Sequence, residues 1–167
     1  MLPVMNTIEN FLWTDDFLLG YQPMDDTHRE FVELVNAMLA ADDAGFPALL
    51  DRFSEHALAH FEHERIWMQE SNFPATDCHV DEHGAVMKSV EQVRMVVATG
   101  NITEGRRLAR ELAKWFPGHA DYMDASLAQW MVKRNTGGAP IVLRRGAAKR
   151  EEASSASPSP LDWSEKP

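Results

Sequence analysis

Cysteine and long apolar runs are both nearly missing from this chain. Cys78 is its one cysteine, which excludes an intramolecular disulfide and fits a reducing compartment. No apolar run approaches the roughly 20 residues that a membrane-spanning helix needs. The N-terminal sequence MLPVMNTIENFLWTDD lacks the basic segment and the continuous apolar segment of a signal peptide. We therefore expect a cytoplasmic protein without membrane insertion.

Basic residues are also few. The chain has 16 Lys and Arg against 26 Asp and Glu, a formal net charge of −10. Residues 135–167 carry five basic and four acidic residues, or +1, which leaves −11 on residues 1–134. This excess of negative charge would repel phosphate backbones, so we expect no nucleic-acid partner. The hydrophobic share of 44% in 167 residues is sufficient for one well-packed soluble domain.

Apolar residues recur with helical spacing from about residue 23, and strand-like alternation is hard to find. The predicted helices cover about residues 24–41, 48–71, 77–98 and 103–134. Four amphipathic segments joined by short connections predict an all-α fold, an antiparallel up-and-down four-helix bundle over residues 23–134. Residues 1–22 are expected to form an N-terminal arm.

Residues 135–167 are rich in Ala, Ser, Pro and charged residues, a composition that predicts a disordered C-terminal tail. The alternative is a docking peptide for a protein partner. Its contact residues would be the basic cluster Arg144, Arg145, Lys149 and Arg150, or the segment Leu161-Asp162-Trp163. The pattern indicates no particular oligomeric state.

All seven histidines lie in the predicted helices or at their starts. At about 100° per residue, His60 and Glu64 fall at the centre of the apolar face of the second helix, whereas His56 and His63 lie at its margins. An unpaired carboxylate in an apolar interior costs several kcal/mol. Glu64 therefore needs a cation, which could be a histidinium, a long side chain from another helix, or a metal.

The other helices repeat this pattern of inward polar residues. His79 and His83 have the i, i+4 spacing at which two imidazoles on one helix reach one metal. His28 shares the apolar stripe of the first helix, and His119 and Asp124 flank the face that carries Phe116, Met123 and Leu127. Five inward histidines and two carboxylates exceed the needs of one metal and suit two metals bridged by both carboxylates. Mixed nitrogen and oxygen donors favour iron or manganese.

Over residues 11–134 these residues and spacings resemble the hemerythrin family, specifically its bacterial single-domain members. The matching elements are Trp13, Leu19-Gly20-Tyr21, Met24-Asp25-Asp26-Thr27-His28, His60-Phe61-x-x-Glu64 with Met68, His79-x-x-x-His83, and Trp115-x-x-x-His119 with Asp124. The resemblance implies a non-haem di-iron centre with an oxo or hydroxo bridge that binds dioxygen reversibly, for oxygen storage, delivery or sensing.

The resemblance also implies a role for each residue. One iron ion would be held by His79, His83 and His119, the other by His28 and His60, and Glu64 and Asp124 would bridge them. The second iron would keep an open position for dioxygen. Phe31, Phe116 and Trp115 would line the oxygen pocket.

Three residues depart from the family pattern. Arg65 stands where a second glutamate is common, but its position points outward, so the metal site should be unaffected. Trp67 replaces a smaller aliphatic residue before Met68. Pro117 lies inside the fourth predicted helix, where it removes a backbone hydrogen bond and predicts a kink. We expect His56 and His63 not to contact iron and Cys78 to be passive.

Two other function classes compete with oxygen binding. A di-iron oxidase, peroxidase or ferroxidase would be an enzyme, and ferritin-like enzymes build their sites from Glu-x-x-His pairs. The chain contains no such pair. An oxygen or redox signalling protein would act through the C-terminal tail.

Overall fold

The computed structural model describes residues 11–137, so the predictions for the tail fall outside the described residues. Its elements are η1 (Asp15–Phe17), α1 (Gln22–Ala40), α2 (Phe46–Glu70), α3 (Thr76–Ala98), α4 (Ile102–His119), η2 (Ala120–Asp124) and α5 (Ala125–Thr136). No strand occurs between residues 11 and 137. Within that range, none of the helices combines the length and the apolar character that crossing a membrane would require.

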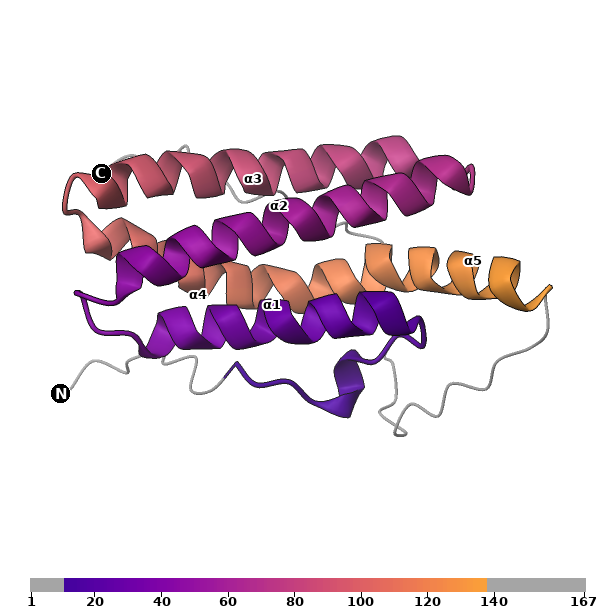
Figure 1. The fold of residues 1–167 in the computed structure, drawn as a ribbon, viewed down its shortest axis with the longest axis horizontal. Helices are drawn as coiled ribbons and strands as arrows, with labels where there is room; N and C mark the ends of the chain where they lie inside the picture. Colours follow the sequence, from indigo (N-terminus) through magenta and orange to yellow (C-terminus); the bar gives the residue numbers. More distant parts are fainter. Residues whose placement is uncertain (1–10, 138–167) are drawn as a thin grey trace, which may run out of the picture.

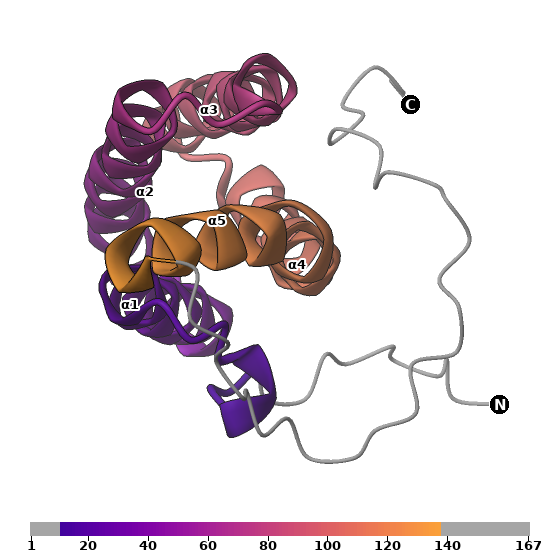
Figure 2. The same cartoon turned by 90° about the vertical axis from the view of Figure 1, so that its right-hand side faces the viewer.

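The helices form an up-and-down bundle, as the sequence predicts (Figure 1). α1 packs on α2 and α4, and α3 packs on the same two helices. The α4, η2 and α5 elements follow one another without a loop and together make the fourth member of the bundle. Figure 2 shows α1, α2, α3 and α4 arranged around a common interior.

Local signals explain where the helices begin and end. Prolines occupy the first turns of α1 and α2. Backbone N–H groups in a first turn have no acceptor within the helix, so the N–H that proline lacks is not needed there. α2 ends at Glu70, and Asn72, with a φ of 54°, reverses the chain. The Phe73 N–H closes this turn onto the Met68 carbonyl at 2.9 Å. The side chain of Asn101 caps α4 by accepting a hydrogen bond from the Glu104 N–H.

Two apolar clusters fill the interior. The larger contains Phe31, Phe53, Phe116 and Leu112, and the smaller contains Met24, Met68 and Leu127. Buried polar residues separate the two clusters along the helices. On α1, for example, His28 lies between Met24 of the smaller cluster and Phe31 of the larger. The bundle is therefore apolar toward both ends and polar in a layer between them.

The segment after Pro117 is irregular, although α4 itself continues to His119. η2 is a turn of π-helix, in which the Ala125 N–H donates to the carbonyl of Ala120, five residues earlier. Figure 2 shows the consequence: α4 is seen nearly end-on, whereas α5 runs across the view. The change of direction that Pro117 predicts is thus present, but the irregular turn lies three residues further along the chain.

The π-helical turn also corrects the sequence-based placement of Met123. In an α-helix, residues five apart differ by about 140° in direction. A π-helical turn closes on itself after five residues, which brings His119 and Asp124 onto one side. Asp124 is fully buried, and Met123 is turned away to a half-buried position. The expected inward face of Phe116, Met123 and Leu127 is therefore wrong for Met123 and right for the other two.

Two glycines allow a matched test of this packing. A Cβ added at Gly105 would lie 2.4 Å from Cε1 of Phe46 and 2.9 Å from Cγ2 of Val97, whereas a Cβ at Gly84 meets no atom within 4 Å. We expect Gly105→Ala to lower the free energy of unfolding by about 1–3 kcal/mol, because the core must move to admit a methyl group. Gly84→Ala should raise it by about 0.5–1 kcal/mol through helix propensity. Urea denaturation measures both, and equal stability of the two variants would contradict the close α2–α4 contact.

Candidate metal centre

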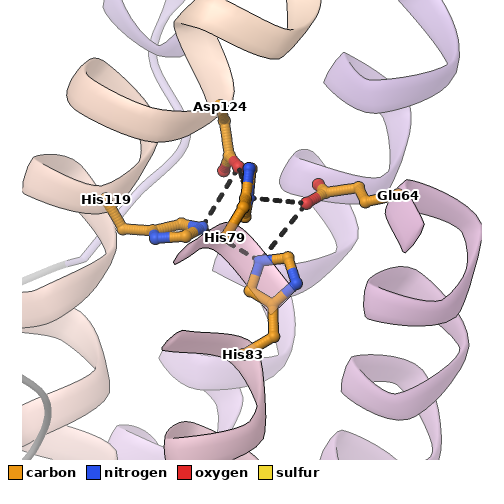
Figure 3. A group of neighbouring side chains, drawn as sticks. All are labelled: Glu64, His79, His83, His119 and Asp124. Atoms are coloured by element: carbon orange, nitrogen blue, oxygen red, sulfur yellow. Dashed lines mark hydrogen bonds and ion pairs between the residues drawn. The ribbon is translucent and has the colours of Figure 1, made fainter. Parts of the chain in front are cut away.

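The seven residues predicted to bind metal converge in the middle of the bundle. They come from α1, α2, α3, α4 and the π-helical turn, and each is at most 4% exposed. Figure 3 shows five of them, with the imidazoles of α3 and α4 and the carboxylate of Asp124 directed toward Glu64. The complete set is His28, His60, Glu64, His79, His83, His119 and Asp124.

Glu64 presents a different oxygen to each half of this cluster. Its Oε1 lies 2.7 Å from Nε2 of His60 and 3.6 Å from Nε2 of His28. Its Oε2 lies 3.3 Å from Nε2 of both His79 and His83. The carboxylate therefore spans two sets of imidazoles, one on each side.

Asp124 divides its oxygens between the same two sets. Its Oδ1 lies 2.9 Å from Nε2 of His79 and 3.1 Å from Nε2 of His119, while its Oδ2 lies 3.0 Å from Nε2 of His28. We call His79, His83 and His119 the three-histidine group, and His28 and His60 the two-histidine group. Two carboxylates that each share their oxygens between both groups have the arrangement of bridges between two cations.

The buried charges balance one another in the absence of metal. Burial raises the pKa of Glu64 and so does the charge of Asp124, but His60 and His28 outweigh both and hold it well below its usual range. Burial lowers the pKa of His28, yet its contacts with Asp124 and Glu64 raise it to about 9. The same opposition raises the pKa of His79 to about 10. Burial likewise lowers the pKa of His119, but Asp124 and Glu82 outweigh it and raise the pKa, so the two carboxylates face imidazoles that hold their protons more strongly than a free histidine.

Several atoms at the centre of the cluster lie in ion-pair contact with one another but form no hydrogen bond of regular geometry among the described residues. They are Nε2 of His28, Nε2 of His79, Oε2 of Glu64 and Oδ1 of Asp124. A buried polar atom whose hydrogen bonds are not made costs up to about 3 kcal/mol. Because all four point into one space and all are metal-ligand atom types, cations bound between them would satisfy the whole set. The residues present therefore fit a pair of metal ions.

His56 and His63 lie outside the cluster, as expected. The two ring nitrogens of His56 face the Thr27 carbonyl at 3.2 Å and the Glu30 carboxylate at 3.3 Å. His63 is exposed and its ring stacks on that of Trp67 at 6.3 Å. Neither imidazole has a free nitrogen directed at Glu64 or Asp124.

The three aromatic residues predicted to line the oxygen pocket contact different histidine groups, although the rings of Phe31 and Trp115 lie 6.4 Å apart. Phe31 and Phe116 stack at 4.7 Å, and the Phe116 ring meets that of His28 edge-on at 5.1 Å. Both are therefore next to the two-histidine group. Trp115 instead stacks on His119 at 4.3 Å, on the side of the three-histidine group.

Two buried carboxylates contribute to this region without having been identified as site residues from the sequence. Asp25 accepts hydrogen bonds from the backbone N–H groups of Leu19 at 2.8 Å and Gly20 at 3.0 Å, which fixes the chain entering α1. Glu82 lies directly behind His119. A signal for Glu82 was available: it follows His79 by three residues, so helical phase puts both on adjacent parts of one face.

The fold and this site together define a helical-bundle protein with a buried histidine and carboxylate cluster of metal-binding type. The more specific family follows from comparison. Residues 19–131 match the model of the hemerythrin HHE cation binding domain. The chain belongs to the hemerythrin family.

Several curated proteins named bacteriohemerythrin are similar to this chain. The one from Ralstonia nicotianae is 38% identical over 122 residues, covering 73% of this chain and 89% of that protein. The one from Stenotrophomonas maltophilia is 25% identical over 139 residues, covering 76% of this chain and 90% of that protein. The one from Pseudomonas paraeruginosa is 24% identical over 141 residues, with 77% and 92% covered. No solved structure gives a significant match.

Proposed function

We propose that this chain binds dioxygen reversibly at a non-haem di-iron centre held by the seven buried side chains. The observation that carries the proposal is the division of both carboxylates between a three-histidine group and a two-histidine group. The three-histidine group would hold one iron, the two-histidine group would hold the other, and both carboxylates would be shared between them. When bound, the two iron ions supply the two electrons that dioxygen takes up.

The protein's own contribution is to keep the two-histidine group dry. Phe31 and Phe116 are 0% and 1% exposed, and they cover the His28 and His60 side of the cluster. Apolar walls disfavour the entry of water and anions, which would otherwise compete with dioxygen for the open position. Trp115 has a different role because its ring stacks on His119, in the three-histidine group.

Oxygen binding rather than oxidation is favoured by the donor set. Histidines outnumber carboxylates five to two at this site, whereas ferritin-like oxidases use carboxylate-rich sites with Glu-x-x-His pairs. The relatives' shared name, bacteriohemerythrin, supports the same function. We infer a role in oxygen storage, delivery or sensing, in the cytoplasm.

Metal analysis with absorption spectroscopy tests this function. Purified protein should contain two iron ions per chain, and its absorption in the near-ultraviolet should change reversibly as oxygen is removed and restored. If the absorption spectrum of the reduced protein does not change when oxygen is added, reversible binding is refuted. Repeated oxidation of an added substrate with consumption of oxygen would instead identify an enzyme.

A further inference from the structure

Glu82 joins the metal cluster to a tryptophan that lies outside it. Its Oε1 lies 3.1 Å from Nδ1 of His119 and 3.0 Å from Nε1 of Trp115, and its side chain is 7% exposed. A carboxylate oxygen can only accept, so both ring nitrogens donate to it. Nδ1 of His119 therefore carries a proton, which leaves Nε2 as the nitrogen directed at Asp124.

The other four imidazoles of the cluster lack such a partner. Nδ1 is buried and has no hydrogen-bond acceptor among residues 11–137 in His28, His60, His79 and His83. Metal-binding histidines usually donate their second nitrogen to a carboxylate, a carbonyl or water. Within the described structure, a carboxylate therefore supports the three-histidine group through His119, and no equivalent carboxylate supports the two-histidine group.

We propose that Glu82 is a positioning residue that orients His119 and strengthens it as a metal ligand, so that the metal of the three-histidine group is held more tightly in its more oxidised state. A negative group hydrogen-bonded to Nδ1–H pushes electron density onto Nε2. A more electron-rich imidazole stabilises ferric over ferrous iron. This inference rests on the proposed function, because it concerns the iron of the group that does not face the oxygen pocket.

Trp115 moderates the effect of Glu82. Its N–H donates to the same Oε1 that accepts from His119, and its ring stacks on the imidazole with an interplanar angle of 23°. The two donors share the charge of one oxygen. Removing the tryptophan N–H should leave more of that charge for His119, whereas removing the charge of Glu82 should weaken the support.

The first test is Glu82→Gln, which keeps the shape and removes the charge. Metal-free protein is titrated anaerobically with Fe²⁺ against a chelator, and the midpoint potential of the loaded protein is measured by spectroelectrochemistry. We expect a 10- to 100-fold loss of iron affinity, the usual effect of losing such a partner. The affinity for ferric iron should fall at least tenfold more than the affinity for ferrous iron, which raises the midpoint potential by at least about 59 mV for one electron.

The matched control is Asp81→Asn, the same charge change at an exposed position of α3, one residue away. We expect it to retain wild-type affinity and potential. If Glu82→Gln behaves like Asp81→Asn in both measurements, the proposal is overturned.

The second test is Trp115→Phe, which keeps an aromatic ring against His119 and removes the N–H. We expect the potential to fall, opposite in sign to the Glu82→Gln shift. A merely structural role for this contact would move both variants in the same direction, and that outcome overturns the proposal. If Glu82→Gln does not fold, the sign of the Trp115→Phe shift decides alone.

The role of Glu82 and the proposed function can be refuted independently of one another. Anaerobic affinity and potential require iron but no oxygen. A wild-type protein that holds two irons and ignores oxygen would refute reversible oxygen binding and leave the Glu82 comparison intact. A wild-type protein that binds oxygen, with Glu82→Gln unchanged, would refute the role of Glu82 alone.

Discussion

Glu64→Gln is expected to reduce the iron content from two ions per chain to one or none, with an affinity loss above the roughly 100-fold that a supporting residue alone can cause. Each oxygen of Glu64 faces a different histidine group, so this one side chain serves both halves of the cluster. Glutamine keeps a single carbonyl oxygen and turns the other donor into an NH₂ group, which cannot donate a lone pair to a metal.

The loss of charge adds to the loss of a donor atom. Glu64 and Asp124 supply the two negative charges that offset those of the bound cations, and they do so in a fully buried site where charges are weakly screened. With Glu64 neutral, a single carboxylate would face two metal ions. We therefore expect the second ion to be lost first.

The matched control is Glu62→Gln, two residues earlier on α2. Glu62 is half exposed and pairs with Arg65, and a surface pair of this kind contributes about 0–1 kcal/mol. This variant should retain two irons in plasma emission analysis and an unchanged far-ultraviolet circular dichroism spectrum. Two irons in Glu64→Gln would contradict a bridging position for Glu64.

The position of Arg65 illustrates what helical phase alone could predict. On α2 the phase separates His60 and Glu64, at the centre of the inner face, from Arg65, which is 36% exposed and pairs outward with Glu62. The same reasoning selected His28, His79 and His83, because regular α-helices make side-chain direction a function of residue number. The fold and most of the cluster follow from that one periodicity.

The features that the sequence did not reveal depend on backbone irregularity or on contacts between helices. The π-helical turn is defined by a hydrogen bond from the Ala125 N–H to the Ala120 carbonyl. No residue type in this segment predicts such a turn. A buried indole N–H needs an acceptor, so Trp115 belongs beside a carboxylate. Which carboxylate that is depends on how α3 and α4 pack. The sequence of one helix does not determine how the neighbouring helix is rotated about its own axis.

Removing the iron should make stability depend strongly on pH, with an optimum near pH 6.5. On the alkaline side the cause is His28 and His79, whose pKa values in the folded protein are about 9 and about 10, against an ordinary value of 6.5 for histidine. Raised pKa values mean that the protonated forms stabilise the fold. This contribution is complete below pH 6.5 and is lost progressively as the pH rises from 6.5 to about 9 for His28 and about 10 for His79, at a cost on the order of 3 kcal/mol for His28.

On the acid side the signs are reversed. Burial lowers the pKa of His83 to about 3, with the charges of His119 and His79 acting in the same direction, so the fold favours its neutral form. That contribution is present above pH 6.5 and is lost progressively as the pH falls toward 3. Glu64 and Asp124, with lowered pKa values, lose their contributions only at still lower pH, below their ordinary range. Burial also lowers the pKa of His56, to about 4, so acid destabilises the metal-free protein first through His83 and His56.

Bound iron should abolish the alkaline decline, because metal ligation requires deprotonated imidazoles and replaces the protons of His28 and His79. The difference in unfolding free energy between iron-loaded and metal-free protein should thus widen from pH 7 to pH 10, starting from about 4 kcal/mol when free metal is 1,000 times its dissociation constant. Urea denaturation of both forms across this range measures it. Metal-free His28→Gln should lose much of the alkaline decline, whereas His63→Gln, altered at an exposed ring outside the cluster, should keep it. Equal stability of the metal-free protein at pH 7 and pH 10 would mean that these imidazoles carry no proton in the cluster.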